Sequence, residues 1–362
     1  MPSTSLESLH ADVAAARELA AKIPRPVTLM EVCGTHTVAI CKSGLRDLLP
    51  KEIRLISGPG CPVCVSTQGY IDACMELAAS GKVTLATYGD MLRVPGTKLS
   101  LAEARARGAD VRVVYSALDA LTLARAHRDS AVVFVAVGFE TTAPATALAV
   151  KSADAEGLRN FHVLVSHKRI IPAMAALVAA PDLSIDGFIC PGHVSVIIGP
   201  ESYHAIAKAG RPCVIAGFEG ADVARAVRMI LEQITAGRSD VENEYSRAVK
   251  PGGNPKALKL FNDVFEVADE DWRGLGVIPA SGFALKGKYR TFDALTAYGV
   301  TIRPAPEPKG CLCGQVVRGA VDPEDCALFG TGCTPAHPIG PCMVSREGSC
   351  AAHYKYARRA AG

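Results

Sequence analysis

Six of the thirteen cysteines of this chain lie in its C-terminal segment, from residue 311 onward. They are Cys311, Cys313, Cys326, Cys333, Cys342 and Cys350. The segment is rich in Gly and Pro and has few large apolar side chains, so it is not expected to bury a core of its own. We therefore expect bonds to sulfur, either covalent or coordinate, to order it.

The spacing of these thiols indicates which bonds to expect. Intervals of 14, 6 and 16 residues separate four of them, on Gly- and Pro-rich loops of the kind that hold a 4Fe-4S cluster. A structural zinc ion is the alternative, although zinc sites usually pair their cysteines in tight C-x-x-C knuckles. Cys313 and Cys342 are spare or alternative ligands. The spacing predicts a 4Fe-4S cluster bound by Cys311, Cys326, Cys333 and Cys350.

Two further thiol motifs lie nearer the N-terminus. Cys33 and His36 are three residues apart in a turn that opens a predicted helix, so a thiolate and an imidazole can bind one metal; a packed thiol and a capping histidine are the alternative. Cys61 and Cys64 form a C-x-x-C behind Gly-Pro-Gly, which suits two ligands of one metal or a reversible dithiol. Redox use is favoured for this pair. Three cysteines in apolar or helical surroundings are interpreted as packed thiols: Cys41, Cys74 and Cys213.

Composition narrows the class of protein. A chain of 362 residues with 49% apolar residues predicts two or three globular domains. The net charge is only +3, and no basic stripe is interleaved with aromatic residues, so nucleic-acid binding is not expected. The sequence shows no signal-peptide pattern and no run of about 18 apolar residues, so we expect no membrane association and a cytoplasmic protein. In that reducing compartment, clustered cysteines favour metal or redox chemistry over structural disulfides.

The elements that must position these residues follow a regular alternation. Apolar residues at helical spacing predict an amphipathic helix over 5–22. Short β-branched runs then alternate with Ala- and Leu-rich helical segments as far as residue 236, which predicts parallel strands joined by crossover helices. The predicted strands are 27–32, 53–57, 83–88, 111–116, 131–138, 161–166, 185–190 and 213–217.

The predicted fold class is α/β, with two lobes of parallel sheet flanked by helices and a small irregular cysteine-rich iron-sulfur domain. One large sheet or a barrel is the alternative. The segments 137–150 and 216–227 each continue a strand into Gly-Phe-Glu and an Ala-rich helix, which favours two lobes, although a chance match explains so short a repeat equally well. The predicted domains are 1–24, a helix packing on the C-terminal domain; 25–130 and 131–236, the two lobes; and 237–362, the irregular C-terminal domain.

The polar residues fall where parallel sheets bind ligands, beyond the carboxyl ends of strands. Cys33 and His36 follow the first predicted strand, and residues 58–64 follow the second. Later strands are followed by further polar residues: Gly89-Asp90, Phe139-Glu140, His167-Lys168 and Cys190-Pro191-Gly192-His193. We expect one cleft to gather these segments, with the cysteine tail folded back against it.

Long blocks of this sequence resemble the HypD family of maturation factors, which help to assemble the iron centre of nickel-iron hydrogenases. The blocks are MEVCGTHT (30–37), SGPGCPVC (57–64), YGDMLRVPG (88–96), VGFETTAP (137–144), PGHVS (191–195) and FGTGCTPAHPIGPCMVSREGSCAAHYKY (329–356). They occur in the order of the family and span nearly the whole chain. One departure is His353, which stands where the resemblance predicts a Tyr.

The resemblance implies a maturation scaffold with a redox step rather than a conventional turnover enzyme. Its implied partners are a small HypC-type chaperone and a HypE-type donor that delivers cyanide as a thiocyanate. The implied cargo is an iron that acquires two cyanides and one carbon monoxide. Cys33 would be a thiolate ligand of this iron, shared with the N-terminal cysteine of the HypC-type partner, and His36 a nearby ligand or orienting group. Cys61 and Cys64 would be the redox dithiol, refilled from the 4Fe-4S cluster.

Two other functions compete with this interpretation. A stand-alone thiol-disulfide oxidoreductase with an iron-sulfur cluster would use Cys61 and Cys64 in the same way, but it would not need the Cys33 and His36 motif. A radical or electron-transfer iron-sulfur enzyme would usually carry a C-x3-C-x2-C or ferredoxin spacing, which is absent. For a scaffold, we expect the Cα atoms of Cys61 and Cys64 to lie within roughly 7 Å, facing both Cys33 and the tail.

Overall fold

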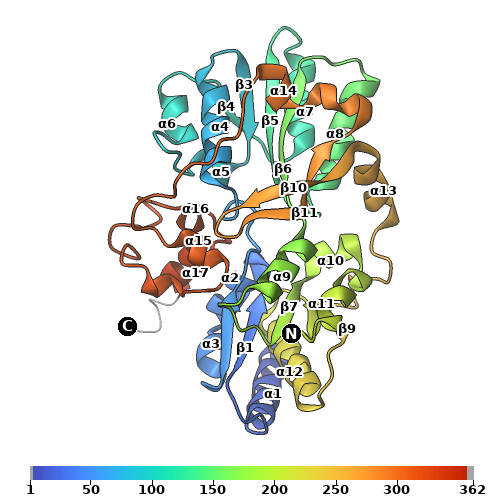
Figure 1. Cartoon of the computed structure of the whole chain (residues 1–362), viewed down its shortest axis with the longest axis vertical. Helices are drawn as coiled ribbons and strands as arrows, with labels where there is room; N and C mark the ends of the chain where they lie inside the picture. Colours follow the sequence, from blue (N-terminus) through green and yellow to red (C-terminus); the bar gives the residue numbers. More distant parts are fainter. Residues whose placement is uncertain (1–2, 357–362) are drawn as a thin grey trace.

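The protein has two lobes, and each is built on a parallel β-sheet (Figure 1). The structure is a computed structural model that describes residues 3–356. The strands of the larger sheet follow the order β2-β1-β7-β8-β9, and those of the smaller sheet the order β4-β3-β5-β6. The α/β class with two lobes is confirmed. The parallel strands are β1 (Val27–Glu31), β2 (Ile53–Ser57), β3 (Val83–Thr87), β4 (Val111–Val113), β5 (Ala131–Gly138), β6 (Phe161–His167), β7 (Gly187–Pro191), β8 (Cys213–Ala216) and β9 (Val241–Asn243).

The eight runs predicted as strands all form strands, and most are apolar enough to be buried on both faces of the sheet, although Val113 of the edge strand β4 is exposed. In β5, for example, Val133 and Val135 enter one apolar cluster, while Val132 and Phe134 enter another. Alternate side chains of a strand point to opposite faces, so both faces of the sheet are covered. The short edge strand β9 is an addition that the sequence pattern did not predict.

The predicted division of the lobes at residue 130 is wrong. The chain builds β1 and β2, crosses to form the smaller sheet from β3 to β6, and returns to place β7 directly beside β1. The smaller sheet therefore takes strands from both predicted lobes. Strand and helix alternate in the same way whichever sheet a strand joins, so the pattern along the chain does not show where it changes sheet.

Helices cover both faces of each sheet. In the larger sheet, one face packs on α1 (Ser3–Ala20), α2 (Gly34–Ser43), α3 (Leu45–Leu48) and α12 (Gly220–Thr235), and the other on α9 (Ile170–Ala179), α10 (Gly192–Ile198) and α11 (His204–Lys208). In the smaller sheet, one face packs on α4 (Gln68–Ala79), α5 (Gly89–Leu92) and α6 (Leu101–Ala106), and the other on α7 (Ala117–Ala126), α8 (Ala143–Ala155) and α13 (Pro255–Val264). Helix α14 (Ala294–Tyr298) lies against β6.

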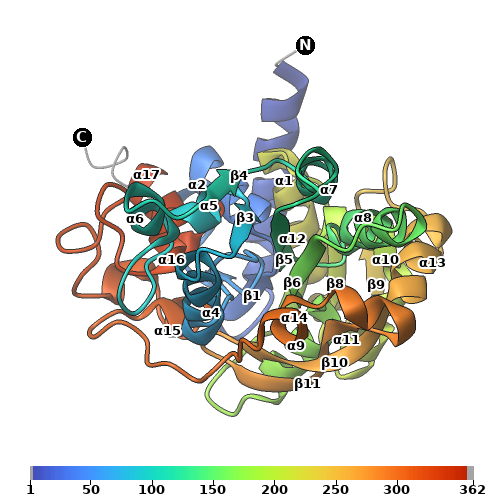
Figure 2. The same cartoon turned by 90° about the horizontal axis from the view of Figure 1, so that it is seen from above.

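An antiparallel hairpin, β10 (Phe265–Trp272) and β11 (Gly276–Leu285), lies between the two lobes in Figure 1 and along one side of the molecule in the view from above (Figure 2). Its Trp272 belongs to the core of the larger sheet, whereas Phe265 belongs to that of the smaller sheet. The buried ammonium of Lys168 lies 2.8 Å from the Glu270 carboxylate of the hairpin, directly after β6. The predicted irregular domain from residue 237 therefore begins too early, since residues as far as α14 belong to the lobes.

The cysteine-rich segment consists of short helices and turns beside the two lobes: α15 (Cys313–Val317), α16 (Pro341–Val344) and α17 (Ser349–Tyr356). It shares its apolar core with the smaller sheet, since Val316, Cys342 and Leu77 of α4 belong to one cluster. This agrees with the expectation that the segment buries no core of its own. Within residues 3–356, no helix combines the length and apolarity needed to cross a membrane.

The N-terminal helix packs on α12, and not on the C-terminal domain as predicted. Leu9 and Val13 of α1 share a core with Val227 of α12. Asp12 is buried at this contact, where its carboxylate accepts a hydrogen bond from Arg228 at 2.8 Å. The apolar stripe of α1 is thus used to complete the larger lobe.

The buried Asp12 predicts a measurable cost of mutation. Asp12→Ala leaves the guanidinium of Arg228 without this acceptor, so the free energy of unfolding should fall by about 1–3 kcal/mol in urea titration. The matched control is Glu156→Ala, which removes an exposed ion pair with Arg125 and should leave the unfolding curve nearly unchanged. Equal curves for the two variants would show that the α1 contact contributes little.

Candidate functional site

Cys33 lies at the carboxyl end of β1, where it forms the N-cap of α2. Its side chain is 8% exposed and lines a cavity of about 240 Å³. The ends of strands from both sheets line the same cavity, through Gly138 of β5 and Pro191 of β7. The predicted gathering of strand ends is thus found only in part between the lobes, because the segments after β3 and β6, Gly89-Asp90 and His167-Lys168, do not line this cavity. Burial raises the pKa of the Cys33 thiol to about 12.

A buried carboxyl group holds the Cys33 turn in place. Glu31, the last residue of β1, accepts a hydrogen bond from the backbone N–H of Cys33 at 2.9 Å and another from the Thr37 hydroxyl. Burial raises the pKa of Glu31 to about 7, although these hydrogen bonds act in the opposite direction. The Thr37 hydroxyl lies one helical turn beyond Cys33, so the start of α2 is tied to the end of its preceding strand.

His36 is near Cys33 in sequence, but its ring does not line the cavity. The ring is fully buried, its Nε2 lies 2.9 Å from the carbonyl oxygen of Gly217, and it stacks on Phe218. Burial lowers the pKa of His36 to about 4, so the neutral ring donates its N–H to that carbonyl. This placement favours an orienting role for His36 and leaves direct iron binding as a prediction.

Two residues absent from the predicted site line the cavity with Cys33: His193 and Glu347. His193 lies two residues after β7 and stacks on Phe218 with a centroid separation of 3.9 Å, so both histidines stack on this ring. Its position after a strand was the available signal. Glu347 comes from the cysteine-rich segment and accepts a hydrogen bond from the Thr35 hydroxyl at 2.6 Å. No local pattern indicates a contact between residues so far apart in the chain.

Glycines let three loops meet at Cys33. A Cβ atom on Gly60 would lie 2.2 Å from the backbone nitrogen of Cys33, and one on Gly34 would lie 2.5 Å from the Cβ of Glu347. Real Cβ contacts are never so short, so both positions require glycine. The loop before Cys61 and the C-terminal segment are thereby in direct contact with the Cys33 turn.

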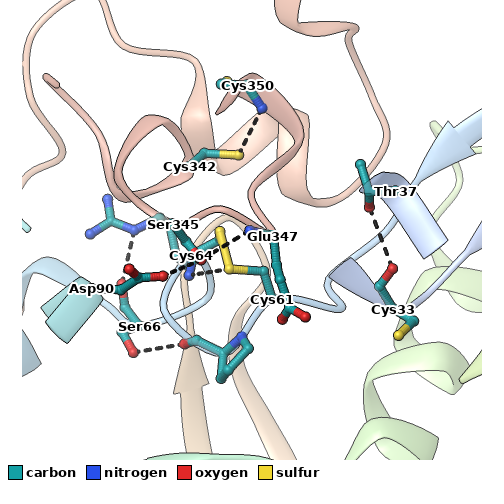
Figure 3. Close-up of a disulfide and its surroundings, with 12 residues drawn as sticks. Cys33, Thr37, Cys61, Cys64, Ser66, Asp90, Cys342, Ser345, Glu347 and Cys350 are labelled. Carbon is teal, nitrogen blue, oxygen red and sulfur yellow. Dashed lines mark hydrogen bonds between the residues drawn. A yellow bond between two sulfur atoms is a disulfide. The ribbon is translucent and has the colours of Figure 1, made fainter. Parts of the chain in front are cut away.

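Cys61 and Cys64 are joined in a disulfide, with their Cα atoms 5.2 Å apart (Figure 3). This agrees with the separation expected for a reversible pair. Both side chains are buried, at 5% and 1% exposed, and only Pro62 and Gly60 of their loop line the Cys33 cavity. Figure 3 shows the disulfide below Cys342, and both belong to one buried cluster.

All six tail thiols line one small pocket next to this disulfide: Cys311, Cys313, Cys326, Cys333, Cys342 and Cys350. Hydrogen bonding to Cys313, together with burial, raises the pKa of Cys311. The sulfur of Cys342 lies 3.4 Å from the backbone nitrogen of Cys350. Across residues 3–356, no three His, Cys, Asp or Glu side chains are arranged as ligands of one metal ion.

A 4Fe-4S cluster is bound by four separate thiolates around a shared volume, and soft thiols around one pocket are suitable donors for it. The structure brings the four predicted ligands together in this pocket. It also places Cys313 and Cys342 among them, so the choice of four from six remains a prediction.

The structure thus groups a disulfide, a pocket lined by six thiols and an interlobe cavity that contains a seventh cysteine, Cys33. Residues 8–357 match the model of a protein family described as "HypD: Hydrogenase formation hypA family". The chain belongs to this family, as its resemblance predicted.

Curated relatives place it in hydrogenase maturation. The chain is 47% identical to the hydrogenase maturation factor HypD of Azotobacter vinelandii, covering 96% of each chain. It is 48% identical to a putative hydrogenase expression/formation protein of Methanocaldococcus jannaschii, over 94% of this chain and 95% of the relative. It is also 47% identical to HypD of Escherichia coli K12, over 92% and 90%. The chain therefore has a role in hydrogenase maturation.

A buried acid near the cavity predicts a pH dependence of stability. Glu140 follows β5, and its Oε1 accepts a hydrogen bond from the Ile170 N–H at 3.0 Å, while its Oε2 is buried without a hydrogen-bond partner. Burial raises the pKa of Glu140 from 4.5 to about 7. The protonated acid is thus preferred in the folded state, so its stabilisation is complete below pH 4.5 and is lost as the pH rises through 7.

Glu140→Gln replaces this acid with a neutral isostere that keeps the acceptor for Ile170. Relative to the wild type, the variant should gain on the order of 3 kcal/mol in free energy of unfolding between pH 5 and pH 8. Urea titrations of both proteins at several pH values measure this difference. Burial also raises the pKa of Glu31, but both proteins contain Glu31, so its contribution to the pH dependence cancels in this difference. A difference that does not change with pH would contradict the burial argument.

Proposed function

We propose that this chain, together with a HypC-type partner, holds the iron of a nickel-iron hydrogenase while it acquires two cyanides and one carbon monoxide. Cys33 binds the iron, and Cys61 and Cys64 supply the electrons that release cyanide from a thiocyanate on a HypE-type donor. One observation carries the proposal. The Cys61–Cys64 disulfide shares a core with the pocket of six thiols, while its loop packs on Cys33 through Gly60.

The cavity suits an iron shared between two proteins. Cys33 reaches it with its thiol, and iron binding would displace the proton that burial favours. A low-spin ferrous iron with cyanide ligands accepts soft thiolates. Because the chain supplies one thiol here, other coordination positions are left for a cysteine of the partner and for cyanide and carbon monoxide. His193 and Glu347 are the polar side chains beside these positions.

The dithiol can supply the two electrons that the release of cyanide consumes. A thiocyanate R–S–CN takes two electrons when its S–CN bond breaks, giving R–SH and hydrogen cyanide. Reduced Cys61 and Cys64 lose two electrons and two protons as they close to the disulfide that the structure contains. Each turnover therefore requires the disulfide to be opened again, with two electrons from outside the pair.

The pocket of six thiols is the proposed source of these electrons. Cys311, Cys326, Cys333 and Cys350 would hold a 4Fe-4S cluster, which supplies electrons one at a time. The chain's own residues keep water away from this route, since Cys342 and Cys64 lie in one buried cluster. A stand-alone oxidoreductase would have no use for the cavity at Cys33, which favours the maturation scaffold.

Cys33→Ala should abolish iron-cyanide loading while the fold and the tail cluster remain, because the thiol lies in a loop and not in a sheet core. Infrared bands of cyanide and carbonyl on the purified complex with the HypC-type partner measure the loading. Cys213→Ala, which removes a buried thiol in β8, should keep these bands. Full cyanide and carbonyl bands on the Cys33→Ala complex would reject the assignment.

Anaerobically purified protein should contain about four iron atoms per chain and show broad visible absorption. Cys326→Ala and Cys333→Ala should each lose most of this absorption, because each removes a proposed cluster ligand. Cys213→Ala again serves as the matched control. One zinc per chain without visible absorption would show that the pocket binds a different metal.

A further inference from the structure

A second cavity, of about 860 Å³, lies at the far end of α2 from Cys33. It is larger than the cavity of about 240 Å³ at Cys33, and the two share no lining residue. The end of α2, helix α3, strand β2 and the C-terminal segment form its walls. The proposed maturation function does not use it.

One thiol opens into this cavity. Of the eleven free cysteines, all in the described part of the chain, nine are buried, and the other two are Cys41 and Cys311. Cys311 belongs to the thiol pocket, whereas Cys41 lines the large cavity. The interpretation of Cys41 as a packed thiol is therefore wrong. A helix was predicted to begin at the Cys33 turn, but part of the wall around this thiol comes from α17, which is remote in sequence.

Cys41 belongs to a cluster of four side chains and is not an isolated cysteine. Nη1 of Arg46 lies 3.2 Å from the Cys41 sulfur, and His353 lines the same cavity as this thiol. Nδ1 of His353 lies 2.9 Å from Oε1 of Glu324 and 3.1 Å from its Oε2. The thiol and the imidazole–carboxylate pair thus line one cavity, and sites that activate a cysteine nucleophile combine the same groups.

The cluster is fixed by contacts outside it. Nε of Arg46 donates to the carbonyl oxygen of Leu55 at 3.2 Å, which directs the guanidinium toward Cys41. Although burial lowers the pKa of His353, interactions with Cys41 and Glu324 outweigh it and raise this pKa to about 9. The ring can therefore carry a proton at neutral pH beside a sulfur atom.

We propose that Cys41 is a nucleophilic thiol that reacts with low-molecular-weight peptide disulfides, with His353 as its proton donor. The Cys41 thiolate attacks one sulfur of the disulfide, whose S–S bond breaks as a new S–S bond to Cys41 forms. The second sulfur leaves as a thiolate and takes the proton of the His353 ring. Cys41 is oxidised, the leaving thiol is reduced, and Arg46 and Glu324 position the reacting pair.

The walls of the cavity suit a small zwitterionic ligand. Lys42 and Lys51 line it beside Asp47 and Asp325, so both signs of charge face the space next to Cys41. A peptide disulfide carries carboxylates and ammonium groups that pair with both. The volume lies within the range of about 300–1,000 Å³ that is usual for small-molecule sites.

Glutathione disulfide is the probe for this site. The purified full chain, kept anaerobic, should gain one glutathionyl group on Cys41, located by mass spectrometry of tryptic peptides. Cys41→Ser should abolish this adduct. His353→Gln should slow its formation about tenfold, because the leaving thiolate loses its proton donor. The matched control is His337→Gln, which replaces an exposed histidine of the same segment and should react like the wild type.

Two further variants keep the test decisive. If His353→Gln fails to fold, Glu324→Gln tests the same link and should also slow the reaction. Cys33→Ala should be labelled normally, so failure of the iron proposal does not affect this result. An adduct on Cys311 with Cys41 unmodified would overturn the proposal. So would unchanged rates in folded variants of His353 and Glu324.

Discussion

Three loops from distant parts of the chain meet backbone to backbone at the Cys33 turn, and the candidate site depends on this contact. Gly60 lies so close to Cys33 that no side chain fits between them, and Gly34 lies equally close to Glu347. The loop of the disulfide and the segment of the six thiols are both anchored here. Because backbone atoms make these contacts, the distances between the three loops do not depend on flexible side chains.

This contact also explains how the two halves of the site remain distinct. Cys33 faces an open cavity, whereas the sulfurs of Cys61 and Cys64 are buried on the side of the tail thiols. In the proposed function, the first arrangement suits an iron cargo that must enter and leave with a partner. The second suits electrons, which need proximity and not solvent access. Two loops in direct contact therefore provide two environments, an open cavity at Cys33 and a buried one at the disulfide.

The sequence predicted the parts of the fold that are encoded locally. The eight apolar runs all form strands, and Cys33 follows β1 because a buried strand must end before a polar turn. Pairing between strands is not encoded locally, so the placement of β7 beside β1 was missed, as was α1 on α12. In the candidate site, the thiols were evident from residue type and spacing. His193 could be found from its position after a strand, whereas Glu347 and the open environment of Cys41 depend on tertiary contacts that no local pattern reports.

The return of the chain from the smaller sheet to the larger one bears on how the protein is synthesised. The smaller sheet uses only residues 83 to 167, so its strands can pair while later residues are still on the ribosome. The central pairing of the larger sheet joins Leu29 to Gly187, so β1 must wait for β7. The Cys33 cavity is completed only by Glu347. A nascent chain therefore lacks the finished cavity until Glu347 has been synthesised, long after Cys33 itself.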